Sequence, residues 1–318
     1  MELASEIRTL FPELAIREGK PLAECTTFRL GGPCPLFIDN PSTDQLPKLI
    51  QTLNKKRMPL LIIGQGSNLV ISDSGLDRAV IRFCSKTPKI DAKGNRVTVS
   101  GDTLLDDLAR FATENEVGDL SFCSGIPGTV GGGIAGNAGA FGRQMGDPLV
   151  SAEILGLDGT IRTVTAKELE FSYRHSKLKE TGGIVLSAAF ELPRITCPEL
   201  GRREKDSLKT ERERILAFRK EHHPDWHTTP CAGSVFRNIE ATSAAERRKA
   251  AGYFLEEAGA HEMSVGGAHL FEKHANIIIG GDGCTAQNVW DLTEKMIAAV
   301  QQKFDLFLTR EIRFLGTF

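Results

Sequence analysis

The sequence lacks the features that mark several large classes of protein. Its 39 Lys and Arg residues nearly balance its 41 Asp and Glu residues, so no overall basic field favours nucleic acid. No apolar run approaches the length of a membrane span, and no G-x-x-x-x-G-K-[ST] stretch predicts a P-loop. The chain opens on acidic and polar residues rather than an apolar signal core. We therefore expect a soluble cytoplasmic protein that binds no nucleic acid and no membrane.

Cysteine gives no sign of a disulfide framework. The seven cysteines are odd in number and scattered, with no C-x-x-C pair, which favours free thiols in a reducing compartment. Three histidines and a cysteine within 222–231 invite a metal interpretation, but Pro224 and Pro230 interrupt any helix that would align them. A solvated loop is the better interpretation, and we expect no metal.

Glycine, in contrast, is concentrated in one stretch, 124–140. Pro127 stiffens its entry and Val130 is apolar, so a packed segment that faces a ligand is favoured over a flexible loop. A second turn, Gly64-Gln65-Gly66-Ser67-Asn68, follows directly after the apolar run 60–63. Such a turn exposes N–H groups that suit a diphosphate, although an ordinary strand-end turn has the same appearance.

The letters Gly131-x-Gly133-x-x-Gly136 match the dinucleotide-binding fingerprint. That fingerprint needs an apolar strand that leads directly into the first glycine. Pro127 and Gly128 stand there instead. We therefore do not interpret the match as a Rossmann site.

Apolar periodicity predicts a chain of mixed helices and strands. The clearest helices are expected over 46–53, 103–115, 204–221, 244–258 and from Thr285 onward, and the clearest strands over 36–39, 60–63, 96–100, 184–192, 234–236, 275–279 and 306–314. Asp158-Gly159 predicts a hairpin, and Thr165 with Glu168 predicts a capping box. The charge run 211–214 is typical of a solvated helical face. The change of composition near 193–205 indicates a domain boundary.

Three polar residues stand out, although each also has an ordinary interpretation. Arg174 precedes a Lys-rich loop, where a surface arginine is expected. Ser234 lies in a small-residue turn, where its hydroxyl can face a ligand or simply begin a strand. Glu311 shares a face of the closing strand with Arg313, which is typical of an ion pair.

Taken in order, a set of motifs resembles one family, the UDP-N-acetylenolpyruvoylglucosamine reductases, also called UDP-N-acetylmuramate dehydrogenases. The motifs are Thr27-Phe28-Arg29-Leu30-Gly31-Gly32, Gly64-Gln65-Gly66-Ser67-Asn68-Leu69, Ser124-Gly125-Ile126-Pro127-Gly128-Thr129-Val130-Gly131-Gly132, Asn137-Ala138-Gly139-Ala140-Phe141-Gly142, Tyr173-Arg174-x-Ser176, Ala232-Gly233-Ser234-Val235-Phe236-Arg237-Asn238, Glu272-Lys273-His274-Ala275-Asn276 and Glu311-Ile312-Arg313-Phe314. The match runs from about residue 25 to the C-terminus. The short spacing from Asn238 to Glu272 resembles the subtype that lacks an extra tyrosine-bearing loop.

The resemblance implies an α+β fold. A two-part FAD-binding domain of the vanillyl-alcohol-oxidase (PCMH) type would occupy 1–195, with its two subdomains divided near 84–95. An α+β substrate-binding domain would occupy 204–303. A closing strand in 304–318 would return to the FAD domain. We expect a monomer.

The resemblance also implies the chemistry. NADPH would reduce FAD, and the flavin would pass the hydride to C3 of the enolpyruvyl ether of UDP-N-acetylglucosamine during peptidoglycan synthesis. Arg174 and Glu311 would stabilise charge at the substrate carboxylate end, and Ser234 would protonate C2. The residues implied for FAD are Gly64, Gln65, Gly66, Ser67, Asn68, Ser124, Gly125, Ile126, Pro127, Gly128, Thr129, Gly131, Gly132, Asn137 and Gly139. Those implied for the substrate are Tyr173, Asn238 and His274, with the pair Arg219-Lys220 as a further candidate cation.

Two alternatives stay open: another enzyme of the same flavin fold with a different small substrate, and a flavin-free nucleotide-binding regulator. The chain also departs from the family pattern at a few positions. Gln65 stands where glycine is commonest, Cys231 where serine is common, and His223 where glutamine is usual. Gly133 and Gly136 stand where bulkier residues are more usual.

Overall fold

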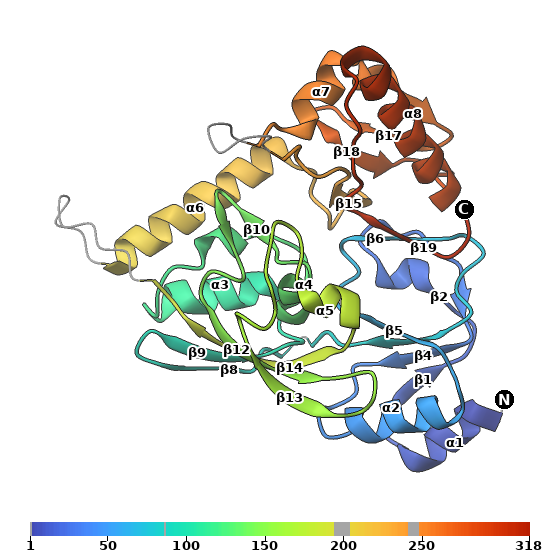
Figure 1. Cartoon of the computed structure of the whole chain (residues 1–318), viewed down its shortest axis with the longest axis vertical. Coiled ribbons are helices and arrows are strands. Elements are labelled where there is room, and N and C mark those ends of the chain that lie inside the picture. Colours follow the sequence, from blue (N-terminus) through green and yellow to red (C-terminus); the bar gives the residue numbers. More distant parts are fainter. Residues whose placement is uncertain (1, 86, 194–203, 241–247) are drawn as a thin grey trace. The chain divides into compact units, whose positions relative to one another are not determined.

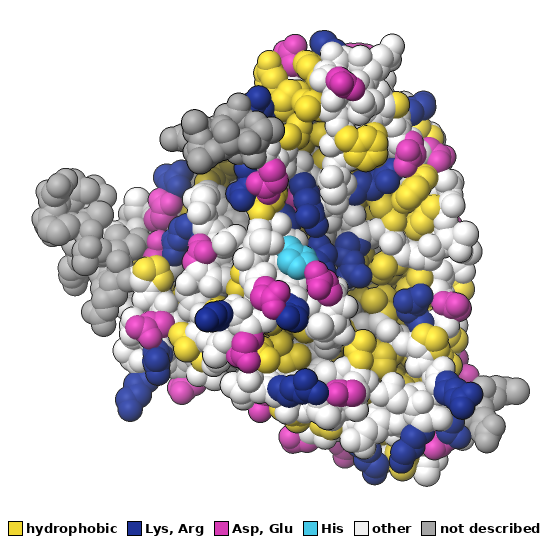
Figure 2. Space-filling model, in the orientation of Figure 1, with side chains coloured by type: hydrophobic (Ala, Val, Ile, Leu, Met, Phe, Trp, Pro, Cys, Tyr) yellow, Lys and Arg dark blue, Asp and Glu magenta, His cyan; other side chains and the backbone are white. Residues whose placement is uncertain are grey.

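The computed structural model describes residues 2–85, 87–193, 204–240 and 248–318, and these form two compact units (Figure 1). The first unit comprises Met1–Glu18, Leu36–Gln65 and Arg78–Arg219, and the second comprises Gly19–Pro35, Gly66–Asp77 and Lys220–Phe318. Both units combine helices with sheets, so the predicted α+β class is confirmed. Among these residues, no helix is both long and apolar enough to cross a membrane. Positive and negative side chains are interspersed on the face shown in Figure 2, in keeping with the nearly balanced composition.

The two larger sheets of the first unit each have their own apolar core, and β10 and β11 form a separate short pair. One sheet has the order β1-β4-β7-β5, and the apolar faces of α1 and α2 cover it (Figure 1). The other has the order β13-β12-β14-β9-β8 and packs against α3 and α4. The helices of this unit are α1 (Glu2–Leu10), α2 (Leu46–Lys55), α3 (Leu105–Glu114), α4 (Val130–Ala135), α5 (Lys177–Thr181) and α6 (Glu204–His222). Its strands are β1 (Ala15–Arg17), β4 (Leu36–Asp39), β5 (Leu60–Ile63), β7 (Ala79–Arg82), β8 (Ile90–Lys93), β9 (Arg96–Ser100), β10 (Gly139–Ala140), β11 (Arg143–Gln144), β12 (Leu149–Leu155), β13 (Ile161–Thr165) and β14 (Ile184–Glu191).

The second unit is built on a sheet of order β15-β18-β17-β16, whose core includes residues of α7 and α8. A separate parallel pair joins β6 to β19, with Leu69 opposite Arg313. The helices of this unit are α7 (Ala251–Glu257) and α8 (Ala286–Phe304). Its strands are β2 (Lys20–Pro21), β3 (Pro33–Cys34), β6 (Leu69–Ile71), β15 (Cys231–Ser234), β16 (Ser264–Val265), β17 (Ala268–Phe271), β18 (His274–Gly280) and β19 (Arg313–Leu315).

The compact units are divided differently from the predicted domains. The chain changes unit at 219–220 rather than at 204, so most of α6 belongs to the first unit, where its Arg212 pairs with Asp106 of α3. The second unit also takes in 19–35 and 66–77, since β6 pairs with β19. The closing strand therefore pairs with a segment from the predicted FAD-binding range, but that segment belongs to the second unit. The expected boundary at 194–203 lies outside the described residues.

Several local predictions are confirmed. β12 and β13 form the hairpin predicted at Asp158-Gly159, with Leu155 opposite Ile161. The side chain of Thr285 caps α8 in a capping box with Asn288. These motifs are encoded within a few residues of sequence, which explains why the sequence reveals them.

Other local predictions are wrong. The reciprocal bonds of Thr165 with Glu168 form, but they close a turn over 166–170 and not a helix. The strand expected over 234–236 lies at Cys231–Ser234, and the closing strand is confined to Arg313–Leu315. For the helix expected over 244–258, the described part is α7, and 241–247 lies outside the described residues.

Candidate functional site

The glycine-rich stretch 124–140 is an ordered turn followed by a short helix. Thr129 caps α4, because its Oγ1 accepts the N–H of Gly132 at 3.2 Å. The N–H of Gly131 donates to the carbonyl of Gly101 at 2.8 Å. These two amides are engaged inside the protein, so the glycine density here serves close packing as well as any ligand.

The second glycine turn contacts the first. A Cβ atom added to Gly64 would lie only 2.4 Å from Oγ1 of Thr129. Oε1 of Gln65 accepts the N–H of Gly128 at 2.6 Å, and Gly128 has a φ of +141°, which favours glycine. Within the first unit, the structure thus brings together parts of the two turns that we predict to bind the cofactor. Gly66, Ser67 and Asn68, the rest of the second turn, belong to the second unit.

An ion pair that the sequence analysis missed anchors the start of the stretch. Asp106 on α3 accepts the N–H of Gly125 at 2.9 Å and two N–H groups of Arg212 at 2.7 and 3.1 Å. Burial opposes the ionisation of Asp106, but Arg212 and Gly125 outweigh it and hold the pKa of this carboxyl below its ordinary value. The charge run 211–214 is therefore not a fully solvated face, because the Arg212 side chain is only 13% exposed.

Arg219 lies beside the same turn. A Cβ atom added to Gly125 would lie 3.0 Å from Cδ of Arg219, whose Nη2 donates to the carbonyl of Phe122 at 3.4 Å. Burial lowers the pKa of Arg219, and the like charge of Arg174 also lowers it. Two like charges close to each other favour an anion near them.

Arg174 occupies the corner of a tight turn in the first unit. Ser172 and His175 exchange two backbone hydrogen bonds of 3.1 Å, and Arg174 between them has a φ of +56°, which is uncommon for a residue with a side chain. Its Nη1 donates to the carbonyl of Gly139 at 2.8 Å, and its guanidinium lies 5.4 Å from the ring centre of Tyr173. Arg174 is half-buried. The turn therefore fixes it more firmly than the ordinary interpretation of a surface arginine would require.

The side chain of Asn137 has a structural role that the sequence does not reveal. Its Nδ2 donates to Oε1 of Gln144 and to the carbonyl of Ser172, and its Oδ1 accepts the N–H of Gly146. These bonds attach the end of the glycine-rich stretch to the turn of Arg174.

Ser234 and Glu311 are neighbours in the second unit. Ser234 ends β15, opposite Ile277 of β18. On the other side of this segment, the N–H of Glu311 donates to the carbonyl of Val235 at 2.7 Å. Residues 77 apart in the sequence are thus placed on adjoining segments, which the sequence analysis obtained only through the family resemblance. Arg174, the third residue of this predicted set, belongs to the first unit.

Asn68 contributes to the same region of the second unit. Its Nδ2 donates to the carbonyl of Glu311 at 3.1 Å, and its own carbonyl accepts the N–H of Arg313 at 3.0 Å. Gly66 is confined by its surroundings, because an added Cβ would lie 2.1 Å from the carbonyl oxygen of Cys25. The predicted cofactor turn is therefore joined, at its end, to the segment that carries Glu311.

The remaining predicted substrate residues lie in the second unit. Nδ1 of His274 accepts the N–H of Asn276 at 3.2 Å, so the ring is neutral with its proton on Nε2. Burial lowers the pKa of His274, and the nearby His222 lowers it further. Oδ1 of Asn238 accepts the N–H of Ala251 at 3.2 Å and so serves the start of α7.

The residues present fit a bound dinucleotide cofactor. At Gly64 the two glycine turns approach so closely that an added Cβ would clash with Thr129, so the backbone of both turns is held in one arrangement. The hydroxyl of Ser124 is fully buried and finds no hydrogen-bond partner among the described residues. A buried hydroxyl of this kind costs free energy unless a ligand or water pairs with it.

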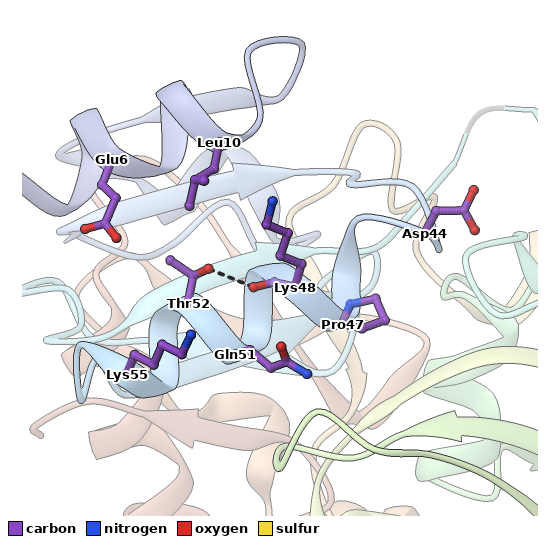
Figure 3. Close-up of a pocket in the computed structure, with 8 residues that line it drawn as sticks. All are labelled: Glu6, Leu10, Asp44, Pro47, Lys48, Gln51, Thr52 and Lys55. Atoms are coloured by element: carbon purple, nitrogen blue, oxygen red, sulfur yellow. Dashed lines mark hydrogen bonds between the residues drawn. The ribbon is translucent and has the colours of Figure 1, made fainter.

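Elsewhere in the first unit, a depression of about 570 Å³ lies between α1 and α2 (Figure 3). Its lining mixes both charges with apolar atoms and contains none of the predicted site residues; it consists of Glu6, Leu10, Asp44, Pro47, Lys48, Gln51, Thr52 and Lys55. Among the described residues, no group of three or more His, Cys, Asp or Glu side chains is arranged to hold a metal.

Comparison with known proteins gives consistent matches. Residues 224–315 match the family described as UDP-N-acetylenolpyruvoylglucosamine reductase, C-terminal domain, and residues 36–165 match the FAD binding domain family. The UDP-N-acetylenolpyruvoylglucosamine reductase of Bacillus velezensis is 33% identical over 302 residues, which cover 95% of this chain and 94% of the relative. A reductase of the same name from Bacillus cereus is 36% identical, with 93% of each chain covered. The crystal structure of the Thermus caldophilus reductase superposes with a TM-score of 0.73 at 27% identity and covers 96% of this chain and 99% of that one.

Proposed function

The chain belongs to the UDP-N-acetylenolpyruvoylglucosamine reductase family, and from that premise we propose that it reduces UDP-N-acetylglucosamine enolpyruvate to UDP-N-acetylmuramate. FAD is the proposed cofactor and NADPH the proposed hydride donor. The reaction would serve the cytoplasmic phase of peptidoglycan synthesis, with the protein acting as a monomer. The observation that carries the proposal is the backbone hydrogen bond from Glu311 to Val235, which brings the segment of Glu311 alongside the segment of Ser234.

When bound, FAD supplies the hydride chemistry, which leaves the protein to bind, orient and protonate. Adding hydride to C3 of the enolpyruvyl group leaves negative charge at C2 that spreads into the carboxylate. Ser234 would deliver the proton to C2, so that one hydride and one proton complete the reduction. A hydroxyl is a weak acid, so Ser234 needs a neighbouring group to assist it.

Arg174 and Glu311 would stabilise the carboxylate end of the substrate. The guanidinium of Arg174 is planar and forked, a shape that matches a carboxylate with two parallel hydrogen bonds. Its position in a tight turn, with one nitrogen already donating to Gly139, supports a fixed orientation. Groups that are oriented before reaction stabilise developing charge without reorganisation during it.

For the cofactor, the contact of Gly64 and Gln65 with the turn at Gly128 supports a cradle in the first unit. The buried hydroxyl of Ser124 offers a further donor or acceptor. His274 presents Nε2–H as a neutral donor, which supports a role with the diphosphate-sugar part of the substrate.

The proposal is tested by mixing the purified protein with NADPH and the enolpyruvyl nucleotide and following the loss of NADPH absorbance. We expect loss that depends on the nucleotide, and a yellow protein with the absorbance bands of a flavin. A colourless protein that cannot be reconstituted with FAD, or NADPH loss that does not depend on the nucleotide, would contradict it.

The role of Ser234 is tested by following the two half-reactions separately. Ser234→Ala should leave flavin reduction by NADPH nearly intact and slow reoxidation by the nucleotide by at least about 10²-fold, because only the second step needs the proton. Ser264→Ala, which removes an exposed hydroxyl in the same unit, is the matched control and should change neither step. Equal slowing of both steps in Ser234→Ala would exclude the proton-donor role.

A further inference from the structure

One face of α8 binds the side chain of Arg310 through three contacts. Nε of Arg310 donates to Oγ1 of Thr293 at 2.8 Å, and its Nη2 donates to the carboxylate of Glu294. The guanidinium also lies 4.2 Å from the ring centre of Trp290. These three partners are at positions i, i+3 and i+4, so they share one face of the helix. Thr293 and Glu294 bind nitrogens of the guanidinium, and Trp290 packs against its plane.

The partners of Arg310 are themselves fixed. The ring of Trp290 stacks on Phe318 and meets the edge of Phe314, with ring centres 5.4 and 4.9 Å apart. α8 begins at a complete capping box, and its apolar face is buried. Arg310 is therefore attached to a rigid element, and its side chain is only 21% exposed.

The backbone of Arg310 leads directly to Glu311. Arg310 forms an isolated bridge with Phe236, and Glu311 then donates its N–H to Val235. Successive side chains of an extended segment point to opposite sides, so with Arg310 held on α8 we expect the side chain of Glu311 to point away from that helix. Regular strand pairing begins only at Arg313. Before it, single hydrogen bonds hold the backbone, including those from Arg237 to Thr309 and from Asn68 to Glu311.

We infer that Arg310 is a positioning residue for Glu311, which it orients through the backbone by its attachment to α8. The inference rests on the proposed function, since it gives Glu311 a task in the reaction. The charge of Arg310 is paired with Glu294, so its contribution is orientation rather than a positive charge offered to the substrate.

The test compares Arg310→Met with Glu311→Gln in the two half-reactions of the FAD-loaded protein. Methionine keeps an unbranched stem but loses all the hydrogen bonds to α8. We expect flavin reduction by NADPH to stay within about twofold, and reoxidation by the nucleotide to slow about 10-fold or more, because small displacements of a reacting group are costly. In the Glu311→Gln background, Arg310→Met should add almost nothing, because both changes remove the same oriented carboxylate.

The outcomes separate the two ideas. If Glu311→Gln does not slow reoxidation, the proposed task of Glu311 is wrong. If Glu311→Gln slows reoxidation but Arg310→Met does not, or if their effects multiply in the double variant, the positioning role of Arg310 is wrong. Slowing of both half-reactions by Arg310→Met would show a merely structural role.

Milder variants keep the test valid if Arg310→Met folds poorly. Thr293→Val and Glu294→Gln each remove one partner of Arg310 and should slow reoxidation by a smaller factor, again only when Glu311 is present. Lys303→Met is the matched control. Lys303, near the end of α8, also contacts an aromatic ring, that of Phe304, and pairs with a glutamate, Glu257 of α7. It lies far along the helix from Thr293. Absence of any effect in both milder variants would overturn the inference.

Discussion

At the scale of single residues, Gly64 tests whether the close approach of the two glycine turns is needed for FAD binding. Gly64→Ala should lower the affinity for FAD at least about 10-fold and reduce stability by about 1–3 kcal/mol, because the new Cβ would lie 2.4 Å from Oγ1 of Thr129. Cofactor binding is measured by flavin fluorescence during titration of the apoprotein, and stability by urea unfolding.

Gly136→Ala is the matched control for this change. Gly136 ends α4 with a φ of −87°, and an added Cβ would meet nothing closer than 3.4 Å. It should therefore keep the FAD affinity and gain up to about 1 kcal/mol of stability through a less flexible unfolded chain. If both variants bind FAD like the parent protein, the contact at Gly64 does not shape the cofactor site.

Glycine density also shows where residue-level prediction ends. The sequence indicates that 124–140 is confined, but it does not show whether each glycine faces a ligand or a neighbour. The backbone N–H groups of Gly131 and Gly132 donate hydrogen bonds within the protein, and the side chain of Asn137 donates to another segment. The partner of Gly131 is 30 residues away and that of Asn137 is 35 residues away, so local pattern does not reveal them.

At the scale of elements, the carboxylate of Asp106 on α3 joins α6 through Arg212. Asp106→Asn replaces the charged acceptor of Arg212 and should lower the free energy of unfolding by about 1 kcal/mol at neutral pH. The pair is partly exposed, which keeps the expected effect modest. Unfolding in urea is followed by far-UV circular dichroism.

The pH dependence of this difference has a definite sign. The folded pKa of Asp106 lies below the ordinary value of 3.8, so its stabilisation is complete above that value and disappears as the pH falls through the folded pKa. The difference between wild type and Asp106→Asn should therefore persist from neutral pH down to about 3.8 and disappear only as the pH falls below that value. Asp107→Asn, which breaks only the local pair with Arg110, should cost no more than about 0.5 kcal/mol. An equal cost in the two variants would show that Asp106 does not anchor α6.

Elements follow from the sequence when their determinants are local. The hairpin at Asp158-Gly159 and the capping box at Thr285 are examples. The turn after Thr165 shows the limit, since the box forms but the chain does not continue as a helix. α6 shows another, because the inward turn of Arg212 depends on Asp106, which is distant in sequence.

At the scale of the whole molecule, each compact unit combines segments that are distant in the sequence. The motifs gave the α+β class and the family, because their order along the chain is specific. They did not reveal that 66–77 belongs with the C-terminal segment, since a parallel pairing of β6 with β19 joins residues more than 240 apart. The segments of Ser234 and Glu311 are also distant in sequence, and the pattern within either one does not reveal that they adjoin.

The division into two compact units predicts which parts of the molecule unfold locally when the C-terminal strand is removed. A variant that stops at Ile312 lacks β19 and the rings of Phe314 and Phe318 that meet Trp290. Hydrogen exchange should show protection falling by at least about 10²-fold in peptides of the second unit, such as 274–280, since each 1.4 kcal/mol is tenfold. Peptides of the first unit, such as 149–155, belong to a separate core and should keep their protection.

Phe318→Ala removes only the stacked ring and should give a smaller loss confined to the same peptides. The comparison distinguishes two modes of unfolding. If the first unit loses protection as strongly as the second, the two cores open together and the units are not independent in stability. If only the second unit responds, the strand pair at the end of the chain holds together the segment that carries Glu311 without being needed for the proposed FAD cradle. Cofactor retention by the truncated protein then provides a second readout, because flavin bound through Gly64 and Gly128 should remain while reoxidation by the nucleotide is lost.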